Sequence, residues 1–237
     1  SVRYAVIVAT GVQVRVGARV LVGESSFRIA GGDRIGLVGR NGAGKTTLTK
    51  VLAGEGQPTA GTVSRTGAVG YLPQDPRTGD LEVLARDRIL AARGLDVTLR
   101  DLRAAEVAMA SPDHGIQERA MRRYARLDAE FTAAGGYAAE SEAASIASSL
   151  GLPERVLGQP LRTLSGGQRR RVELARILFT GAQTLLLDEP TNHLDADSVV
   201  WLRDFLMSYQ GGLVVISHDV ALLDTVVNRV FHLDANR

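Results

Sequence analysis

The sequence contains no cysteine, which excludes disulfide bonds and thiolate metal sites and fits a cytoplasmic protein. No run of about 18 apolar residues is present, so we expect no segment that crosses a membrane. Lysine is scarce: all but two of the 28 basic residues are arginine. This excess is typical of a genome rich in G and C, and it makes the two lysines, Lys45 and Lys50, conspicuous.

The net charge is only +2, which is too small to indicate nucleic-acid binding by itself. The chain has 237 residues, of which 45% are hydrophobic and 23% charged, as in ordinary globular proteins. A chain of this length buries roughly 70–75% of its unfolded surface, so we expect a substantial core.

Residues 1–30 alternate apolar and polar side chains, which predicts antiparallel strands. The apolar runs "RIGLV" (34–38), "TLLLD" (184–188) and "GLVVIS" (212–217) are typical of buried strands, with helical segments between them. This alternation predicts an α/β fold with a parallel sheet and helices on both faces.

Residues 80–150 have helical spacing, with breaks expected near 111–115 and 134–136. We therefore expect a single domain, 1–237, in which a core (1–79 and 160–237) carries an inserted helical subdomain (80–159).

The segment "GRNGAGKT" (39–46) fits the phosphate-loop pattern, and it follows a predicted strand and opens a predicted helix. Backbone N–H groups of such a loop point at phosphate oxygens, and the helix N-terminus favours negative charge. Lys45 would reach the β- and γ-phosphates, and the Thr46 hydroxyl would hold Mg²⁺. The alternative, a glycine-rich turn without a ligand, fits this context poorly. The expected ATP-binding residues are Gly39, Arg40, Asn41, Gly42, Ala43, Gly44, Lys45, Thr46 and Thr47.

The strand "TLLLD" ends in one acidic residue, Asp188, and a second, Glu189, follows it, at the edge where ligands sit in open α/β sheets. Asp188 would hold Mg²⁺, and Glu189 would polarise the attacking water, a role worth roughly 10²–10⁴-fold in rate. The alternative is a pair of surface acids before Pro190, which is a poor explanation after a complete phosphate loop.

Two further residues follow predicted strands at the same edge of the sheet. Gln74, after "VGYLP", could ligate Mg²⁺ or water, although a glutamine after proline is usually only a loop residue. His218 could hydrogen-bond the γ-phosphate or the attacking water, although a lone histidine is more often structural.

The segment "LSGGQ" (164–168) opens another predicted helix. Ser165 and Gln168 fit a reciprocal capping box. That explanation leaves Gly166 and Gly167 unexplained, because each glycine costs a helix roughly 1 kcal/mol. Glycines here would let another backbone or a phosphate come close.

These motifs together resemble the ATP-binding cassette (ABC) superfamily. The phosphate loop resembles Walker A, "TLLLDE" Walker B and "LSGGQ" the ABC signature, while Gln74 matches the Q-loop, "NHLD" (192–195) the D-loop and His218 the H-switch. The resemblance implies an ABC-type P-loop NTPase core and a Mg²⁺-dependent ATPase. It further implies that a second cassette pairs head to tail. The residues that would then act on the partner's nucleotide or interface are Ser165, Gly166, Gly167, Gln168 and Asp195.

One position departs from the family. Its members usually stack adenine on an aromatic residue upstream of Walker A, and the matching position here is Val16, with no aromatic beside it. We therefore expect weak base stacking and no tight preference for ATP over GTP.

"NHLD" and the long stretch between Gln74 and Ser165 resemble the ABC-F group. That group lacks membrane segments, carries two cassettes in one chain and acts on the ribosome in translation control or antibiotic resistance, including macrolide-type resistance. The resemblance implies a first cassette that ends before the inter-domain linker.

Two other functions stay open: the soluble ATPase of a drug exporter with separate membrane subunits, and an ATPase of repair or chromosome type. The absence of a long coiled-coil pattern disfavours the last. Contacts with rRNA are possible at "RRYAR" (122–126) and "RRR" (169–171), but the charge of the insert is balanced.

Overall fold

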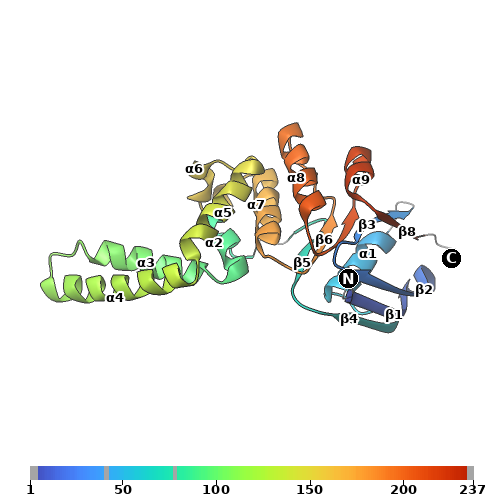
Figure 1. The fold of residues 1–237 in the computed structure, drawn as a ribbon, viewed down its shortest axis with the longest axis horizontal. Coiled ribbons are helices and arrows are strands. Elements are labelled where there is room, and N and C mark those ends of the chain that lie inside the picture. The colour runs from blue at the N-terminus through green and yellow to red at the C-terminus, as the bar shows by residue number, and fades with distance from the viewer. Residues whose placement is uncertain (1–4, 40–42, 77–78, 234–237) are drawn as a thin grey trace. The chain divides into compact units, whose positions relative to one another are not determined.

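The computed structural model describes residues 5–39, 43–76 and 79–233 (Figure 1). The chain divides into two compact units: Ser1–Arg77 with Gly181–Arg237, and Thr78–Thr180. The first unit carries all the strands that the structure describes, and the second is helical. Residues 160–180, which we expected in the core, lie in the helical unit, because the helix Gly166–Phe179 packs on helices of that unit.

The first unit begins with an antiparallel sheet of order β2-β1-β4. Its strands are β1 (Ala5–Val16), β2 (Arg19–Ala30) and β4 (Ala60–Arg65). Alternate side chains of β1, among them Ile7, Ala9, Val12 and Val14, are buried in the core. The predicted antiparallel strands are therefore confirmed.

A parallel sheet of order β5-β6-β7-β3-β8 forms the centre of this unit. Its strands are β3 (Arg34–Gly39), β5 (Val69–Leu72), β6 (Thr184–Asp188), β7 (Gly212–Ile216) and β8 (Arg229–Leu233). Every residue of β6 and β7 is buried, as their continuous apolar runs predict. Because the strands are parallel, their carboxyl ends meet at one edge, where the motifs were expected to gather.

Helices cover both faces of the parallel sheet, as predicted. Helix α1 (Ala43–Ala53) packs on β1 and β2 on one side and on β3, β5 and β6 on the other. Helices α8 (Ala196–Ser208) and α9 (Val220–Val226) lie above the sheet in Figure 1, on the side away from α1.

The second unit is helical among its described residues, apart from turns, irregular connections and one isolated antiparallel bridge between Leu84 and Pro160. Its α-helices are α2 (Ala85–Leu90), α3 (Asp96–Ala108), α4 (His114–Ala133), α5 (Gly136–Ser149), α6 (Glu154–Leu157) and α7 (Gly166–Phe179). Helices α3 and α4 form a hairpin, and α7 packs on α2 and α5. The breaks lie where the sequence predicts them: Asp113 caps α4, and Gly135 separates α4 from α5 with a φ of 72°. No helix in the described part of the chain is long and apolar enough to span a membrane.

Candidate nucleotide-binding site

A cavity of about 310 Å³ opens at the carboxyl edge of the parallel sheet. Its lining comes from four separated segments: the start of α1 and the residues that end or follow β5, β6 and β7. The lining residues are Lys45, Thr46, Gln74, Asp188, Glu189, Ile216 and His218. The structure thus brings together six of the residues that the sequence analysis selected.

The turn between β3 and α1 requires glycine at Gly39. A Cβ atom added there would lie 2.4 Å from the Leu233 carbonyl oxygen of β8, closer than atoms can approach. The Lys45 ammonium group donates a hydrogen bond to the Gly39 carbonyl at 3.1 Å, so the lysine side chain reaches back to the end of β3. Residues 40–42, which were also predicted to bind phosphate, lie outside the described residues.

Helix α1 and strand β6 meet at a hydroxyl–carboxylate contact. The Thr46 hydroxyl donates a hydrogen bond to Oδ2 of Asp188 at 3.0 Å. Asp188 is only 2% exposed, because it is the last residue of a fully buried strand. These oxygen atoms are of the type that Mg²⁺ prefers in proteins.

Glu189 adopts a left-handed backbone conformation with φ of 53°, which is uncommon for a residue with a side chain. Its N–H group donates to the Ile216 carbonyl at 2.8 Å, which ties the turn after β6 to β7. Its carboxylate is buried and contacts His218 twice. The backbone N–H of His218 donates to Oε2 of Glu189, and the ring Nε2 of His218 lies 3.3 Å from Oε1 of Glu189. The turn therefore holds the carboxylate at the cavity wall.

Tyr71 was missed by the sequence analysis, because a tyrosine in a short apolar strand looks like an ordinary core residue. Its hydroxyl is buried and has no hydrogen-bond partner among the described residues. Burial, followed by the charges of Glu55 and Asp188, raises the pKa of Tyr71 to about 12. A neutral phenol therefore lies in the electrostatic field of the Asp188 carboxylate.

Val16, at the end of β1, is 60% exposed and has no aromatic neighbour in sequence. The position where the family usually has an aromatic ring for base stacking is therefore open to solvent and occupied by a valine.

A second cavity, about 630 Å³, lies at the opposite edge of the parallel sheet, beside Gly31, Ala182 and Tyr209. None of its lining residues is charged, so it is not suited to bind phosphate.

The "LSGGQ" segment starts α7 as predicted. The Ser165 hydroxyl accepts from the Gln168 N–H at 3.1 Å, and the Gln168 side chain accepts from the Ser165 N–H at 2.9 Å, so the predicted capping box is confirmed. A Cβ atom added to Gly166 would meet no atom within 4 Å. Packing inside this chain therefore does not require glycine at that position.

The arginines after the capping box do not form a free basic patch. The Arg169 guanidinium donates to the carbonyls of Leu161 and Arg162, and that of Arg171 donates to the carbonyl of Gly151. Arg170 is buried. The three side chains thus belong to the packing around the start of α7.

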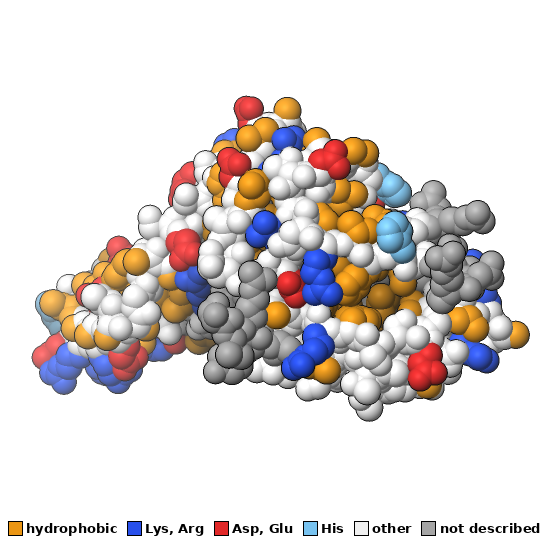
Figure 2. Space-filling view, turned by 45° about the vertical axis from the view of Figure 1, so that its right-hand side comes forward, with side chains coloured by type: hydrophobic (Ala, Val, Ile, Leu, Met, Phe, Trp, Pro, Cys, Tyr) orange, Lys and Arg blue, Asp and Glu red, His pale blue; other side chains and the backbone are white. Residues whose placement is uncertain are grey.

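The basic cluster of the hairpin is also balanced by acids. Arg122 pairs with Glu118 at 2.8 Å, and Arg123 lies 3.8 Å from Asp101. In Figure 2, basic and acidic side chains lie next to one another over the face that is shown.

Asp195, the predicted interface residue, is exposed and caps α8 by accepting from the Ser198 N–H at 2.8 Å.

Comparisons with known proteins agree with this arrangement. The sequence model of the family described as ABC transporter matches residues 22–192. The chain is 40% identical over 233 residues to the tylosin resistance ATP-binding protein TlrC of Streptomyces fradiae, covering 94% of this chain and 41% of that protein. It is 36% identical over 223 residues to the energy-dependent translational throttle protein EttA of Haemophilus influenzae, covering 91% of this chain and 39% of that protein. The chain thus spans about two fifths of the length of these relatives.

Among solved structures, the dimeric structure of MJ0796, a bacterial ABC transporter cassette, has a TM-score of 0.67 at 19% identity. The match covers 97% of this chain and 94% of that one, and it shows the fold. The architecture is therefore that of a P-loop ATPase with an α/β core. The chain belongs to the ABC transporter family, and its similarity to TlrC and EttA confirms the predicted ABC-F type.

Proposed function

We propose that this chain is one ATP-hydrolysing cassette of a two-cassette ABC-F protein, and that the cavity at the sheet edge binds Mg²⁺ and ATP. The observation that carries this proposal is the convergence of Lys45, Asp188, Glu189 and His218, from separate segments, on one cavity. A lysine beside a helix N-terminus suits phosphate, and the acids opposite suit a metal ion and a water molecule.

The residues present fit a magnesium ion. The Thr46 hydroxyl and the Asp188 carboxylate are already 3.0 Å apart, and the Gln74 amide lines the same cavity. The ion, when bound, would neutralise charge on the phosphates. The loop that begins at Gly39 and the start of α1, with Ala43, Gly44 and Thr47, would supply backbone N–H groups to the same phosphates.

In this proposal Glu189 takes the proton of the attacking water. Its carboxylate is held by two contacts with His218, so its oxygen atoms are positioned before the nucleotide arrives. The His218 side chain is 73% exposed, which leaves its ring accessible to a γ-phosphate.

The signature residues would complete the site of another cassette. Open space beside Gly166 and the capped start of α7 leave room for a γ-phosphate that this chain does not hold. Ser165, Gly167 and Gln168 belong to the same turn, and the exposed Asp195 would lie at the pairing interface. Pairing is supported by the name of the MJ0796 structure, which describes that cassette as dimeric.

We further propose a cytoplasmic role on the ribosome, in antibiotic resistance or translation control. The printed names of TlrC, a tylosin resistance protein, and EttA, a translational throttle protein, support these two roles. The alternative is the ATPase of a drug exporter with separate membrane subunits. The balanced charge of the α3–α4 hairpin gives no independent support for rRNA contact.

Ribosome co-sedimentation with the full-length parent protein tests this proposal. The variant carries Glu189→Gln together with the same substitution of the matching glutamate in any second cassette. Bound ATP should then persist, because it is not hydrolysed. We expect pelleting with ribosomes in ATP and not in ADP, and the same protein with Lys45→Ala as a further change should stay in the supernatant. Absence of pelleting in both nucleotides would favour the exporter function.

A further inference from the structure

Helix α2 carries three consecutive charged residues whose side chains point to three different helices. Each makes one ion pair: Arg86 with Glu154 of α6 at 2.8 Å, Asp87 with Arg103 of α3 at 3.1 Å, and Arg88 with Glu173 of α7 at 2.8 Å. Successive residues of a helix point about 100° apart, which explains how one short helix reaches three neighbours. Only the last of these pairs involves the helix that begins with the signature residues.

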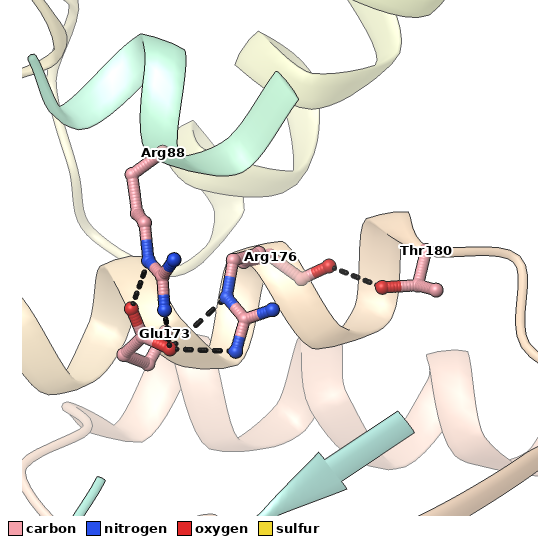
Figure 3. A network of polar contacts seen from close by, with 4 residues as sticks. All are labelled: Arg88, Glu173, Arg176 and Thr180. Carbon is pink, nitrogen blue, oxygen red and sulfur yellow. Dashed lines mark hydrogen bonds and ion pairs between the residues drawn. The ribbon is translucent and has the colours of Figure 1, made fainter. Parts of the chain in front are cut away.

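The pair between Arg88 and Glu173 is part of a cluster around a buried carboxylate, shown in Figure 3, in which both arginine side chains are about a quarter exposed. Glu173 is 1% exposed, and its carboxylate accepts from Nε and Nη2 of Arg88 at 2.8 and 3.3 Å. Arg176, one turn further along α7, donates through the same two atoms at 3.0 and 2.9 Å. We call Arg88, Glu173 and Arg176 the Glu173 cluster.

The geometry of this cluster constrains α7 strongly. A buried carboxylate must keep its charged partners, because water cannot replace them. Arg88 is the member of the cluster that comes from another helix, and its planar guanidinium group uses two N–H donors, which sets direction as well as distance. The Arg88–Glu173 pair therefore constrains the rotation of α7 about its axis and its position along α2, while Arg176, on α7 itself, holds the Glu173 carboxylate in place. The same rotation decides which way Ser165 and Gly166 point at the start of α7.

We propose that the Glu173 cluster positions the start of α7 so that the signature residues reach the nucleotide of the neighbouring cassette. Arg88 and Glu173 are positioning residues: neither lines the cavity that holds Lys45 and Glu189. This inference rests on the proposed composite site. It predicts that a change in the cluster damages the partner's site and spares the site of the altered chain.

Mixing two altered chains tests the prediction. Lys45→Ala destroys a chain's own site and keeps its signature, whereas Glu173→Gln keeps the site and displaces the signature. Each variant alone should hydrolyse ATP at least ten-fold more slowly than wild type. The mixture should recover about a quarter of the wild-type rate. Half of the randomly formed pairs contain one chain of each variant, and each of these mixed pairs holds one complete site, whereas a wild-type pair holds two. Glu173→Gln alone should still bind a fluorescent ATP analogue with wild-type affinity.

Matched controls separate the cluster from the composite site. Ser165→Ala mixed with Lys45→Ala should recover activity in the same way. If that control recovers and the Glu173→Gln mixture does not, the role of the cluster is refuted and the composite site stands. If neither recovers although sedimentation shows that the chains are paired, the composite site itself is refuted. Arg86→Gln, which breaks the exposed pair of the same helix, should keep wild-type hydrolysis.

A second measurement does not depend on pairing. Amide hydrogen exchange over residues 165–170 should become at least ten-fold faster in Glu173→Gln and stay at the wild-type rate in Arg86→Gln. Arg88→Lys, which keeps the charge and loses the two-donor geometry, should show an intermediate rate and serves if Glu173→Gln folds poorly. Unchanged exchange in both cluster variants would overturn the proposal.

Discussion

At the scale of single residues, the backbone of Glu189 is the most informative feature of the site. A residue with a side chain pays roughly 1–2 kcal/mol to adopt a left-handed conformation. The hydrogen bond from the Glu189 N–H group to the Ile216 carbonyl holds the residue in this conformation, together with the contacts between its carboxylate and His218. Strain of this kind persists where the surrounding structure fixes the position, and it is common at functional sites.

Comparison of Glu189→Gly with Glu189→Ala isolates this strain. Both variants lose the carboxylate, so both should lose ATP hydrolysis. The glycine variant should be more stable than the alanine variant by about 1 kcal/mol, because glycine adopts positive φ without strain. Chemical denaturation of both proteins measures the difference. An alanine variant that is the more stable of the two, as at ordinary positions, would show that the strain is absent.

At the scale of elements, the start of α7 combines a stabilising capping box with open space beside Gly166. The reciprocal hydrogen bonds of Ser165 and Gln168 satisfy two N–H groups of this helix end. Gly166 beside them leaves the surface uncovered. The cap stabilises the helix, and packing inside the chain does not require the glycine.

Substitutions of Ser165 should separate these two contributions. Ser165→Ala should lower the free energy of unfolding by about 1 kcal/mol, since the capping oxygen is lost. Ser165→Asn should keep most of that stability, because asparagine caps equally well. In both variants ATP hydrolysis by paired cassettes should fall. Stability is read from urea denaturation, and a wild-type hydrolysis rate in Ser165→Asn would argue against a role in the partner's site.

Elements with a strong periodic or glycine signal were predictable from the sequence. The strands that end at Gly39, Asp188 and Ile216 and the capping box of α7 all have such local signals. The Arg88–Glu173 pair was not predictable, because 85 positions separate its members and charged residues at helical spacing usually face solvent. The left-handed turn at Glu189 has no local signal either, since it depends on a hydrogen bond to another strand.

At the scale of the whole molecule, the proposed site is incomplete in one cassette. The cavity at the sheet edge is lined by the residues that we propose for nucleotide binding and water activation, and none of the signature residues lines it. A single chain in dilute solution should therefore bind nucleotide and hydrolyse it slowly.

Specific ATPase activity should rise with protein concentration, because pairing follows mass action. The measurement is a steady-state phosphate-release assay over a wide range of concentrations, with sedimentation at each point to report the paired fraction. Lys45→Ala is the blank. High activity that does not change with concentration, in a preparation shown to be monomeric, would contradict the composite site.

The division of the chain also sets an order for its folding during synthesis. The helical unit, Thr78–Thr180, is contiguous, so all of it has left the ribosome before Gly181. Strands β6 and β7, which occupy the middle of the parallel sheet, follow later. The start of α1, which carries Lys45, therefore lacks two of its supporting strands until Ile216, the end of β7, has been made. Nucleotide binding by this cassette should appear only after that point, and a truncation before β6 should remove it while the helical unit is already complete.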